Sequence, residues 1–502
     1  MLLSGRSCFR SLLALCRYQM GKSMPYRLAF LITARHSFAT SSVTRTAPFV
    51  HLLSTSTVSM QSKCNMSEKL TLFDAMGVTG KYKFSIGAPG PADLKKVAAI
   101  MERVAAQRMK EEKNTEGASL LQYGAPLGDP RSIRALAKFL AAEYGMPVSE
   151  SHLAFTSGAT AGFLHLLLQM FPNKCTVYAE GLAYHVALQM LRDFNFKIRS
   201  VPNEVDGINV DRLEEIWAKD LKEVSTEEQS KKPYQALLYT VPIFHNPTGT
   251  ILSPAKCERV VKLARKYHVL ILSEDVYNML YYDGSTKPPK RLFAYDSEDD
   301  PDYGVGHVVS NCTFSKLLSP GLRLGWQELP VALREKYYDK SSVIVSGGGL
   351  NPVIGGCVTL ALEDGTVSKF ISEIRTSHAK KMEMTIEMLN RLMPSSCKLY
   401  HPSNVCITIT FIRLSFDYNT KKGGYFLYVI LPSKLNAVEF VKYAKEKYGI
   451  SLQEGFKFQS STEDFVKELS NGFRISIPYP TFEEMRDGVH YLCEALKECI
   501  KE

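Results

Sequence analysis

The sequence contains no C-x-x-C pair, although eleven cysteines are spread over its 502 residues. Cysteines that are so dispersed and odd in number do not make a disulfide framework, and they are typical of a reducing compartment. No apolar run approaches the ~18–20 residues that a membrane span needs. We therefore expect neither a disulfide scaffold nor a membrane-spanning segment, and no metal ion is expected.

Acidic residues are absent from residues 1–67, which hold eight Lys and Arg residues. The formal net charge of the whole chain is +10, so residues 68–502 carry only +2. This balance excludes the basic footprint that is typical of nucleic-acid binding. A basic, Ser- and Thr-rich leader without acids is typical of a mitochondrial targeting segment, and otherwise we expect a cytoplasmic protein. The alternative is an untranslated or disordered leader, with Met60 or Met66 as the true start.

Helical and strand patterns alternate from about residue 70 onward. The apolar runs 236–244 and 269–275 are typical of buried parallel strands, and 254–268 has helical periodicity with a basic end. The alternation predicts an α/β fold with a mostly parallel central sheet and flanking helices. A chain of 502 residues exceeds the ~250–300 residues of a single core, so more than one structural unit is expected.

The pattern changes after about residue 365. A long helical pattern at 366–392 is followed by the strand patterns 406–416 and 423–432, which are typical of antiparallel strands. Two amphipathic helices follow at 437–449 and 481–500. This order predicts a smaller C-terminal α+β domain. The expected organisation is a leader at 1–67, a large domain with an N-terminal arm at 68–365 and a small domain at 366–502.

The segment TFSKLLSPGLRLGW (313–326) contains a lysine with hydroxyl groups before it and an arginine after it. An amine can hold an aldehyde cofactor as an imine, and hydroxyls with a guanidinium group suit a phosphate. The segment therefore predicts Lys316 as the covalent anchor of such a cofactor. Thr313, Ser315 and Arg323 would hold its phosphate. The alternative is an ordinary surface lysine in a turn.

Two further segments place polar side chains at the ends of buried strands. In YTVPIFHNPTGT, Asn246 can donate its amide to a phenolate-like oxygen. In SEDVYNMLYYDG, Asp275 is a buried carboxylate that needs a positive partner such as a protonated pyridine nitrogen, and Tyr277 can reach the ring oxygen. The pairing of the carboxylate with the ring nitrogen would let the ring accept electrons. Taken alone, each of these residues could equally be a cap at the end of a strand.

These segments together resemble the fold-type-I enzymes that depend on pyridoxal 5′-phosphate, the class I and II aminotransferases. The resemblance covers roughly residues 70–500 and points to the branch of 2-aminoadipate, kynurenine and aromatic aminotransferases. It implies phosphate contacts at the helix start formed by Gly158, Ala159 and Thr160, where relatives often have Ser-Gln in place of Ala-Thr. It also implies that Tyr184 stacks on the cofactor ring. The neighbouring His185 is a less favoured acid/base candidate than the freed lysine.

The resemblance implies three more contacts. Gly87, in FSIGAPGP, permits a close approach to the substrate, and Arg474, on an apolar strand, binds the substrate α-carboxylate. Tyr123 would reach the phosphate of the neighbouring subunit, which implies a homodimer. Catalysis would then depend on Lys316, Asp275 and Tyr184, and Asn246 would also contact the substrate.

The expected reaction is amino transfer between an L-amino acid and a 2-oxo acid, with 2-oxoglutarate as acceptor. Aromatic, 2-aminoadipate-like and branched or aliphatic donors stay open, because no residue that fixes a distal carboxylate is evident and the segment 417–429 departs from relatives. A β-elimination lyase on the same scaffold is the alternative. A ligand domain of a transcriptional regulator is disfavoured, since residues 1–67 lack the pattern of a winged helix.

Overall fold

A seven-stranded sheet organises the larger part of the computed structural model, which describes residues 73, 78–282, 288–346, 350–400 and 423–500. β10 runs antiparallel to both of its neighbours, and the other neighbouring strands are parallel. The α/β prediction with a mostly parallel sheet is confirmed. In spatial order the strands are β2 (Leu153–Thr156), β10 (Gly325–Glu328), β9 (Val308–Thr313), β8 (Val269–Glu274), β7 (Ala236–Thr240), β3 (Thr176–Glu180) and β4 (Lys197–Val201).

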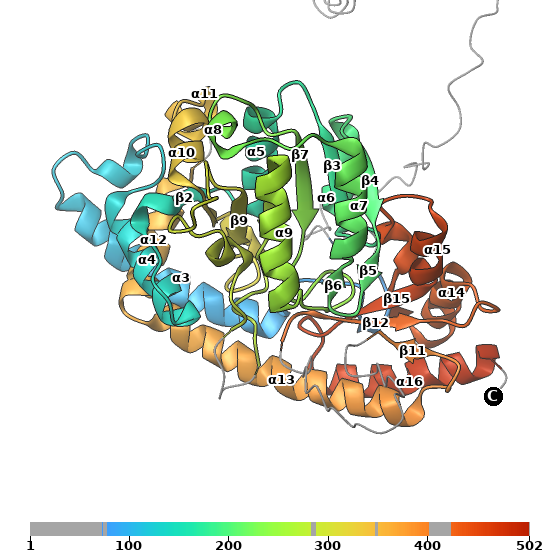
Figure 1. The fold of residues 1–502 in the computed structure, drawn as a ribbon. Helices are drawn as coiled ribbons and strands as arrows, with labels where there is room; N and C mark the ends of the chain where they lie inside the picture. Colours follow the sequence, from blue (N-terminus) through green and yellow to red (C-terminus); the bar gives the residue numbers. More distant parts are fainter. Residues whose placement is uncertain (1–72, 74–77, 283–287, 347–349, 401–422, 501–502) are drawn as a thin grey trace, which may run out of the picture. The chain divides into compact units, whose positions relative to one another are not determined.

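Helices cover both faces of this sheet, and Figure 1 shows α7 and α9 in front of it with α5 and α6 behind. Every residue of β7, β8 and β9 is buried, as expected for strands that are apolar on both sides. The helices of this part are α3 (Pro91–Lys113), α4 (Pro130–Tyr144), α5 (Ala159–Met170), α6 (His185–Asp193), α7 (Val210–Asp220), α8 (Thr226–Gln229), α9 (Pro254–Tyr267), α10 (Val331–Leu333), α11 (Ser342–Val345) and α12 (Pro352–Glu363).

Strand alternation separates the residues of β8 into two sets. Leu270 and Leu272 contribute to the core that also contains the buried side chains of α5 and α6. Val269 and Ile271 contribute to a different core with α7 and α9. Successive side chains of a strand point to opposite faces of the sheet. The polar residues at the end of β8 are therefore expected on different faces.

A second, antiparallel sheet follows late in the chain, in the order β11-β12-β15-β14. It has its own buried cluster with α14 and α16. Its strands and helices are β11 (Lys398–Leu399), β12 (Phe426–Ile430), β14 (Gln453–Glu454), β15 (Gly472–Ser476), α14 (Ala437–Tyr448), α15 (Asp464–Ser470) and α16 (Phe482–Ile500). The strand predicted at 406–416 and the leader 1–67 lie outside the described residues, and the domain boundaries stay predictions.

The long helix α13 (Thr366–Leu392) connects the two sheets, and Figure 1 shows it running below both of them. Its bounds match the helical pattern predicted at 366–392. Phe370 and Ile374 pack in the core of the large sheet, while Met382 and Leu389 pack in the core of the small one. The N-terminal strand β1 (Tyr82–Lys83) pairs in parallel with β13 (Ile450–Ser451), so the arm near Gly87 is tied to the late part of the chain.

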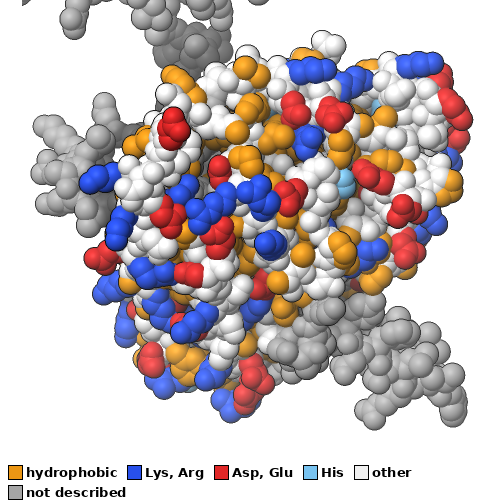
Figure 2. All heavy atoms as spheres, turned by 90° about the vertical axis from the view of Figure 1, so that its left-hand side faces the viewer, with side chains coloured by type: hydrophobic (Ala, Val, Ile, Leu, Met, Phe, Trp, Pro, Cys, Tyr) orange, Lys and Arg blue, Asp and Glu red, His pale blue; other side chains and the backbone are white. Residues whose placement is uncertain are grey.

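Side chains of both charges mix on the face that Figure 2 shows, with Lys and Arg groups lying between Asp and Glu groups. Ion pairs of this kind include Arg131 Nη2 with Glu363 Oε2 at 2.7 Å and Lys96 Nζ with Glu373 Oε2 at 3.0 Å. Among the described helices, none is both long and apolar enough to cross a lipid bilayer.

Candidate active site

Lys316 follows the C-terminal end of β9 and turns inward. Its Nζ donates a hydrogen bond to the carbonyl oxygen of Gly87 (2.7 Å) and lies 5.7 Å from the ring centre of Tyr425. Burial lowers the pKa of Lys316 to about 8, and the positive charge of Arg474 acts in the same direction. An amine with this pKa is partly neutral near physiological pH, which is the form that attacks a carbonyl carbon.

The start of α5 and the turn after Lys316 face each other. Gly158 has φ +94°, and a Cβ there would lie 2.8 Å from Nη2 of Arg323. Only glycine therefore allows this close approach at the helix N-terminus, which has no side-chain cap. Free N–H groups at a helix start beside a guanidinium group form an anion site.

The hydroxyl groups of Thr313 and Ser315 form hydrogen bonds within the turn before Lys316. The Ser315 backbone N–H donates to Oγ1 of Thr313 (3.1 Å), and the two hydroxyl oxygens lie 2.9 Å apart. Thr313 also donates to the carbonyl oxygen of Leu324 (3.2 Å). Thr313 is thus bonded within the turn and positions Ser315, whereas Ala159 lies buried at the helix start and Thr160 is exposed.

Arg474 lies on β15 and is buried among aromatic rings. Its Nη1 donates to Oδ1 of Asn246 (2.9 Å), and its Nη2 donates to the carbonyl oxygen of Ser85 (2.8 Å). Its guanidinium carbon lies 4.1 Å from the ring centre of Phe426, and its Nε has no partner among the described residues. Burial lowers the pKa of Arg474 to about 10. A buried guanidinium group whose described partners are all neutral requires an anion.

Asn246, Tyr277 and Tyr184 come together beside this arginine. The side chain of Asn246 accepts from Arg474 and also lies close enough to the hydroxyl group of Tyr277 to lower its pKa, against the larger rise caused by burial. Burial raises the pKa of Tyr184, and the nearby charges of Glu274 and Arg474 act on the same hydroxyl group. The structure therefore groups these three predicted residues with Lys316, Gly87 and Arg474.

The carboxylate that faces Lys316 is Glu274, the last residue of β8, rather than Asp275. Glu274 accepts a hydrogen bond from Nδ2 of Asn311 (3.1 Å), which also donates to the carbonyl oxygen of Ala159 at the start of α5. Burial raises the pKa of Glu274 to about 7, and the charge of Lys316 opposes this rise. Glu274 thus lies on the α5 side of the sheet, close to the lysine.

Asp275 lies on the opposite side. It accepts hydrogen bonds from the hydroxyl groups of Ser273 (2.8 Å) and Ser310, both of which point away from α5. Burial raises the pKa of Asp275 to about 6, and these two hydrogen bonds oppose the rise. Asp275 was expected to meet the same ring as Tyr277, but β8 ends at Glu274 and the Asp275 carboxylate is bonded to Ser273 and Ser310 instead.

Tyr123 is a predicted site residue that lies at the surface. Its side chain is 82% exposed, in the loop that follows the short 3₁₀ helix Ser119–Leu121. A Cβ on the next residue, Gly124, would lie 2.8 Å from Cγ of Pro352 at the start of α12. The loop is therefore held against α12 while the tyrosine ring points to solvent.

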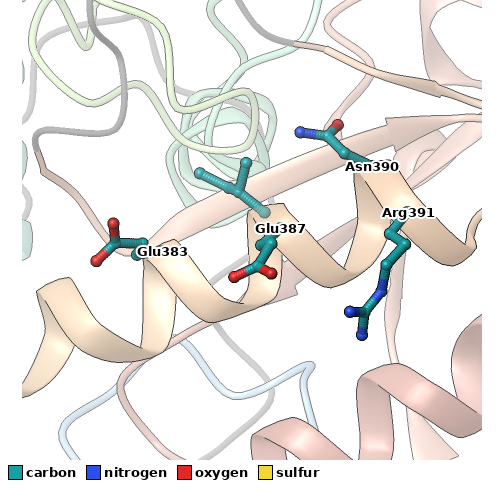
Figure 3. Close-up of a pocket in the computed structure, with 5 residues that line it drawn as sticks. Glu383, Glu387, Asn390 and Arg391 are labelled. Carbon is teal, nitrogen blue, oxygen red and sulfur yellow. The ribbon is translucent and has the colours of Figure 1, made fainter.

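A groove on the C-terminal half of α13 is lined by other residues, and Figure 3 shows the side chains of Glu383, Glu387, Asn390 and Arg391 along this helix. Its volume is about 390 Å³. Carboxylates and a guanidinium group line this groove together with Ile386. Lys316 is not among its lining residues, so the groove is separate from the candidate active site.

The family model described as aminotransferase class I and II matches residues 81–492. The chain belongs to the class I and II aminotransferases. The aromatic-amino-acid aminotransferase 1 of Thermococcus litoralis is 28% identical over 394 residues, which cover 78% of this chain and 84% of the relative. As an enzyme of this family, the chain is an aminotransferase that depends on pyridoxal 5′-phosphate.

Two solved aminotransferase structures share the fold. The kynurenine aminotransferase of Pyrococcus horikoshii, in complex with PMP, superimposes with a TM-score of 0.66 at 23% identity, over 85% of this chain and 93% of that one. LysN, the α-aminoadipate aminotransferase of Thermus thermophilus, is complexed with N-(5′-phosphopyridoxyl)-L-leucine. It gives a TM-score of 0.66 at 21% identity, over 87% and 97% of the two chains.

Three features of this aminotransferase fit the cofactor. Lys316 offers a buried amine of lowered pKa for its aldehyde. The close approach of Gly158 and Arg323 leaves backbone N–H groups and a guanidinium group for its phosphate. Glu274 offers a buried carboxylate for a cationic ring nitrogen. Sequence reasoning missed Glu274, although the alternation of Leu270 and Leu272 toward α5 was a signal that could have found it.

Proposed function

We propose that this aminotransferase moves the amino group of an L-amino acid to a 2-oxo acid, with 2-oxoglutarate as the acceptor. Aromatic, 2-aminoadipate-like and branched or aliphatic amino acids are the proposed donors. The names of the relatives, which include aromatic, kynurenine and α-aminoadipate aminotransferases, support this range. The observation that carries the proposal is the buried guanidinium group of Arg474 beside the amine of Lys316.

Arg474 binds and orients the substrate. Its two terminal nitrogens are held by Asn246 and Ser85, so the guanidinium plane is fixed before a substrate enters. A carboxylate bound to such a preorganised group loses little freedom beyond its own. This contact places the α-carbon of the amino acid toward Lys316.

Lys316 moves the proton in this proposal. Pyridoxal phosphate, when bound, supplies an aldehyde for amine capture and a ring that accepts electrons from the substrate α-carbon. The amine of Lys316, which has a pKa of about 8 because of burial, would take the proton from the substrate α-carbon and pass it to the carbon of the former aldehyde, and it would carry a proton the opposite way when the 2-oxo acid reacts. A pKa near the working pH suits both directions of this exchange.

Glu274, Asn246 and Tyr277 set the charge of the ring. Glu274 takes the role that the sequence suggested for Asp275, since its carboxylate lies on the face of Lys316. Asn246 and Tyr277, which lie near each other, would donate to the ring oxygen. Arg323, Ser315 and the start of α5 would hold the phosphate, with Tyr184 against the ring.

We further propose a homodimer in which Tyr123 completes the site of the partner. Hydrophobic side chains of the chain are exposed near this position in sequence, with Leu121 at 66% and Tyr123 at 82%. A mixture of Lys316→Ala and Tyr123→Ala chains tests the idea, because heterodimers would contain one fully intact site. Activity that appears only on mixing is expected, and two fully inactive parents that stay inactive would contradict it.

A mitochondrial location is proposed from the basic, acid-free composition of residues 1–67. Tagged forms of the full chain and of a chain that starts at Met66 separate this from a cytoplasmic location. Only the full chain is expected in mitochondria. The same distribution for both forms would end the proposal.

A donor screen against 2-oxoglutarate tests the function directly. Net glutamate formation, read together with the mass of the new 2-oxo acid, is expected. Release of ammonia without an acceptor would instead favour the alternative of a β-elimination lyase. Borohydride treatment should also fix the cofactor on the peptide that contains Lys316, and a Lys316→Ala chain should carry none.

A further inference from the structure

Lys381, on the long helix α13, is a buried lysine that the proposed reaction does not use. It is 5% exposed, and its Nζ donates hydrogen bonds to the carbonyl oxygens of Pro478 (2.8 Å) and Pro480 (2.9 Å). Both prolines are buried. Proline has no N–H to join a sheet ladder, so the segment 478–480 depends on donors to its carbonyl oxygens, and Lys381 supplies two of them.

Charges from two other helices act on the same ammonium group. Burial lowers the pKa of Lys381 to about 8, and the negative charges of Asp93 and Glu484 oppose this effect. Asp93 lies in the first turn of α3, and Glu484 lies in the first turn of α16. A buried cation is costly unless it is both hydrogen bonded and paired. The contacts of Lys381 meet both conditions and bring α13 together with the starts of α3 and α16.

The segment 478–480 also packs closely against the N-terminal arm. A Cβ on Gly90 would lie 2.7 Å from the carbonyl oxygen of Tyr479 and 3.2 Å from that of Pro478. Glycine therefore permits an approach that any larger residue would open, because the atoms it meets are backbone atoms. The segment is thus held by Lys381 on one side and touches Gly90 on the other.

The arm that ends at Gly90 reaches the site at two points. The carbonyl oxygen of Ser85 accepts a hydrogen bond from Nη2 of Arg474 (2.8 Å). The carbonyl oxygen of Gly87 accepts one from Nζ of Lys316 (2.7 Å). A shift of the arm therefore moves a backbone group that holds the guanidinium group of Arg474.

We propose that Lys381 is a positioning residue for amino-acid binding, which holds the segment 478–480 and thereby keeps the arm where Ser85 orients Arg474. The inference rests on the proposed function, in which Arg474 binds the substrate α-carboxylate. Lys381 itself touches neither substrate nor cofactor. Without it the arm is held less firmly, so the guanidinium group is less preorganised and the substrate must order it on binding. The loss therefore falls on affinity for the amino acid more than on the rate of the chemical step.

Stopped-flow half-reactions of the holoenzyme with L-phenylalanine, L-leucine and L-2-aminoadipate separate affinity from rate. A concentration series gives an apparent Kd and a limiting rate for the donor that reacts fastest with the wild type. Lys381→Met should raise the apparent Kd about tenfold and change the limiting rate less than about threefold. Lys381→Arg keeps a cation with donors and should stay within about threefold of wild type in both. Lys256→Met is the matched control, because Lys256, on α9, also binds two oxygen groups, those of Glu204 and Asp206, and its loss should change neither value.

Gly90→Ala perturbs the same contact from the arm. Its Cβ meets the carbonyl oxygen of Tyr479, so the apparent Kd should rise as in Lys381→Met. The double variant should fall short of the product of the two single effects, because both displace one contact. Hydrogen exchange of the holoenzyme gives a readout without turnover: peptides that contain residues 84–90 should exchange faster in Lys381→Met and Gly90→Ala than in Lys256→Met.

An unchanged apparent Kd in both Lys381→Met and Gly90→Ala would overturn the inference. A fall in the limiting rate alone would overturn it too, since it would show a structural role without an effect on binding. If Lys381→Met does not fold, the apparent Kd of Gly90→Ala decides the question. If no donor reacts with the wild type, the proposed function fails, while the exchange of residues 84–90 still decides whether Lys381 holds the arm.

Discussion

Replacing Glu274 by Gln should remove most of the catalytic rate while leaving the shape of the site unchanged. The amide is isosteric with the carboxyl group and can keep the hydrogen bond with Asn311. A charge pair about 4 Å apart is worth roughly 4 kcal/mol at an effective dielectric constant of 20. If the carboxylate stabilises a cationic ring by this amount during proton transfer, its loss slows the step by about a thousandfold.

The same substitution should lower the pKa of Lys316, because the charge of Glu274 raises that pKa in the wild-type enzyme. Stopped-flow absorbance of a single half-reaction measures the rate, and the pH dependence of that rate reports the pKa of the freed Lys316 amine. Asp275→Asn is the control, since Asp275 is bonded to Ser273 and Ser310 on the other face. A thousandfold loss in Asp275→Asn, with Glu274→Gln within a few fold of wild type, would refute the assignment.

Three further predictions concern groups around the same sheet edge. Arg474→Gln should lower kcat/KM for amino acids about a hundredfold and change that for the matching amines without a carboxylate less than threefold; equal losses would contradict carboxylate binding. Burial raises the pKa of Glu180 from 4.5 to about 7, so the folded state keeps a proton that the unfolded state has lost, and stability falls by roughly 3 kcal/mol as pH rises through this window. The stability gain of Glu180→Gln in urea unfolding should therefore be larger at pH 8 than at pH 5, and an equal gain at both would argue against a buried acid. Gly158→Ala should weaken cofactor binding at least tenfold, because a Cβ meets Arg323 at 2.8 Å; Gly117→Ala, with φ +84° and open space around it, should leave the cofactor Kd unchanged, and similar effects of both would mean that only backbone strain matters.

Regular elements could be predicted from the sequence because their signals are local. Periodicity alone bounds the helix at 366–392, and α9 begins at Pro254, where proline suits the first helical turn. The buried run 269–275 contains β8, which the structure ends one residue earlier, at Glu274. That end matters, because Asp275 still shares the face of Ser273 whereas Tyr277, in the turn that follows, no longer alternates with it.

The site could be predicted only as far as motifs carry it. Lys316, Asn246, Tyr277 and Arg474 are grouped as the resemblance implied, yet Arg474 meets Asn246 across 228 positions of the chain and Ser85 across 389. No local sequence pattern indicates a contact between residues so far apart in the chain. His185 shows the same limit, since its ring meets that of Phe458 at 5.2 Å although Phe458 belongs to the late part of the chain.

The choice between two adjacent carboxylates shows which physical information the sequence lacks. Glu274 and Asp275 both carry a carboxyl group, and either could follow a buried strand. Burial raises the pKa of both, to about 7 and about 6, so the energetic cost of ionisation does not separate them. What separates them is the partner: hydroxyl groups of the same sheet satisfy Asp275, whereas Glu274 has an amide from Asn311 and the charge of Lys316. A carboxylate already satisfied by its own strands maintains structure, and the one left facing a cation remains available to a bound ring.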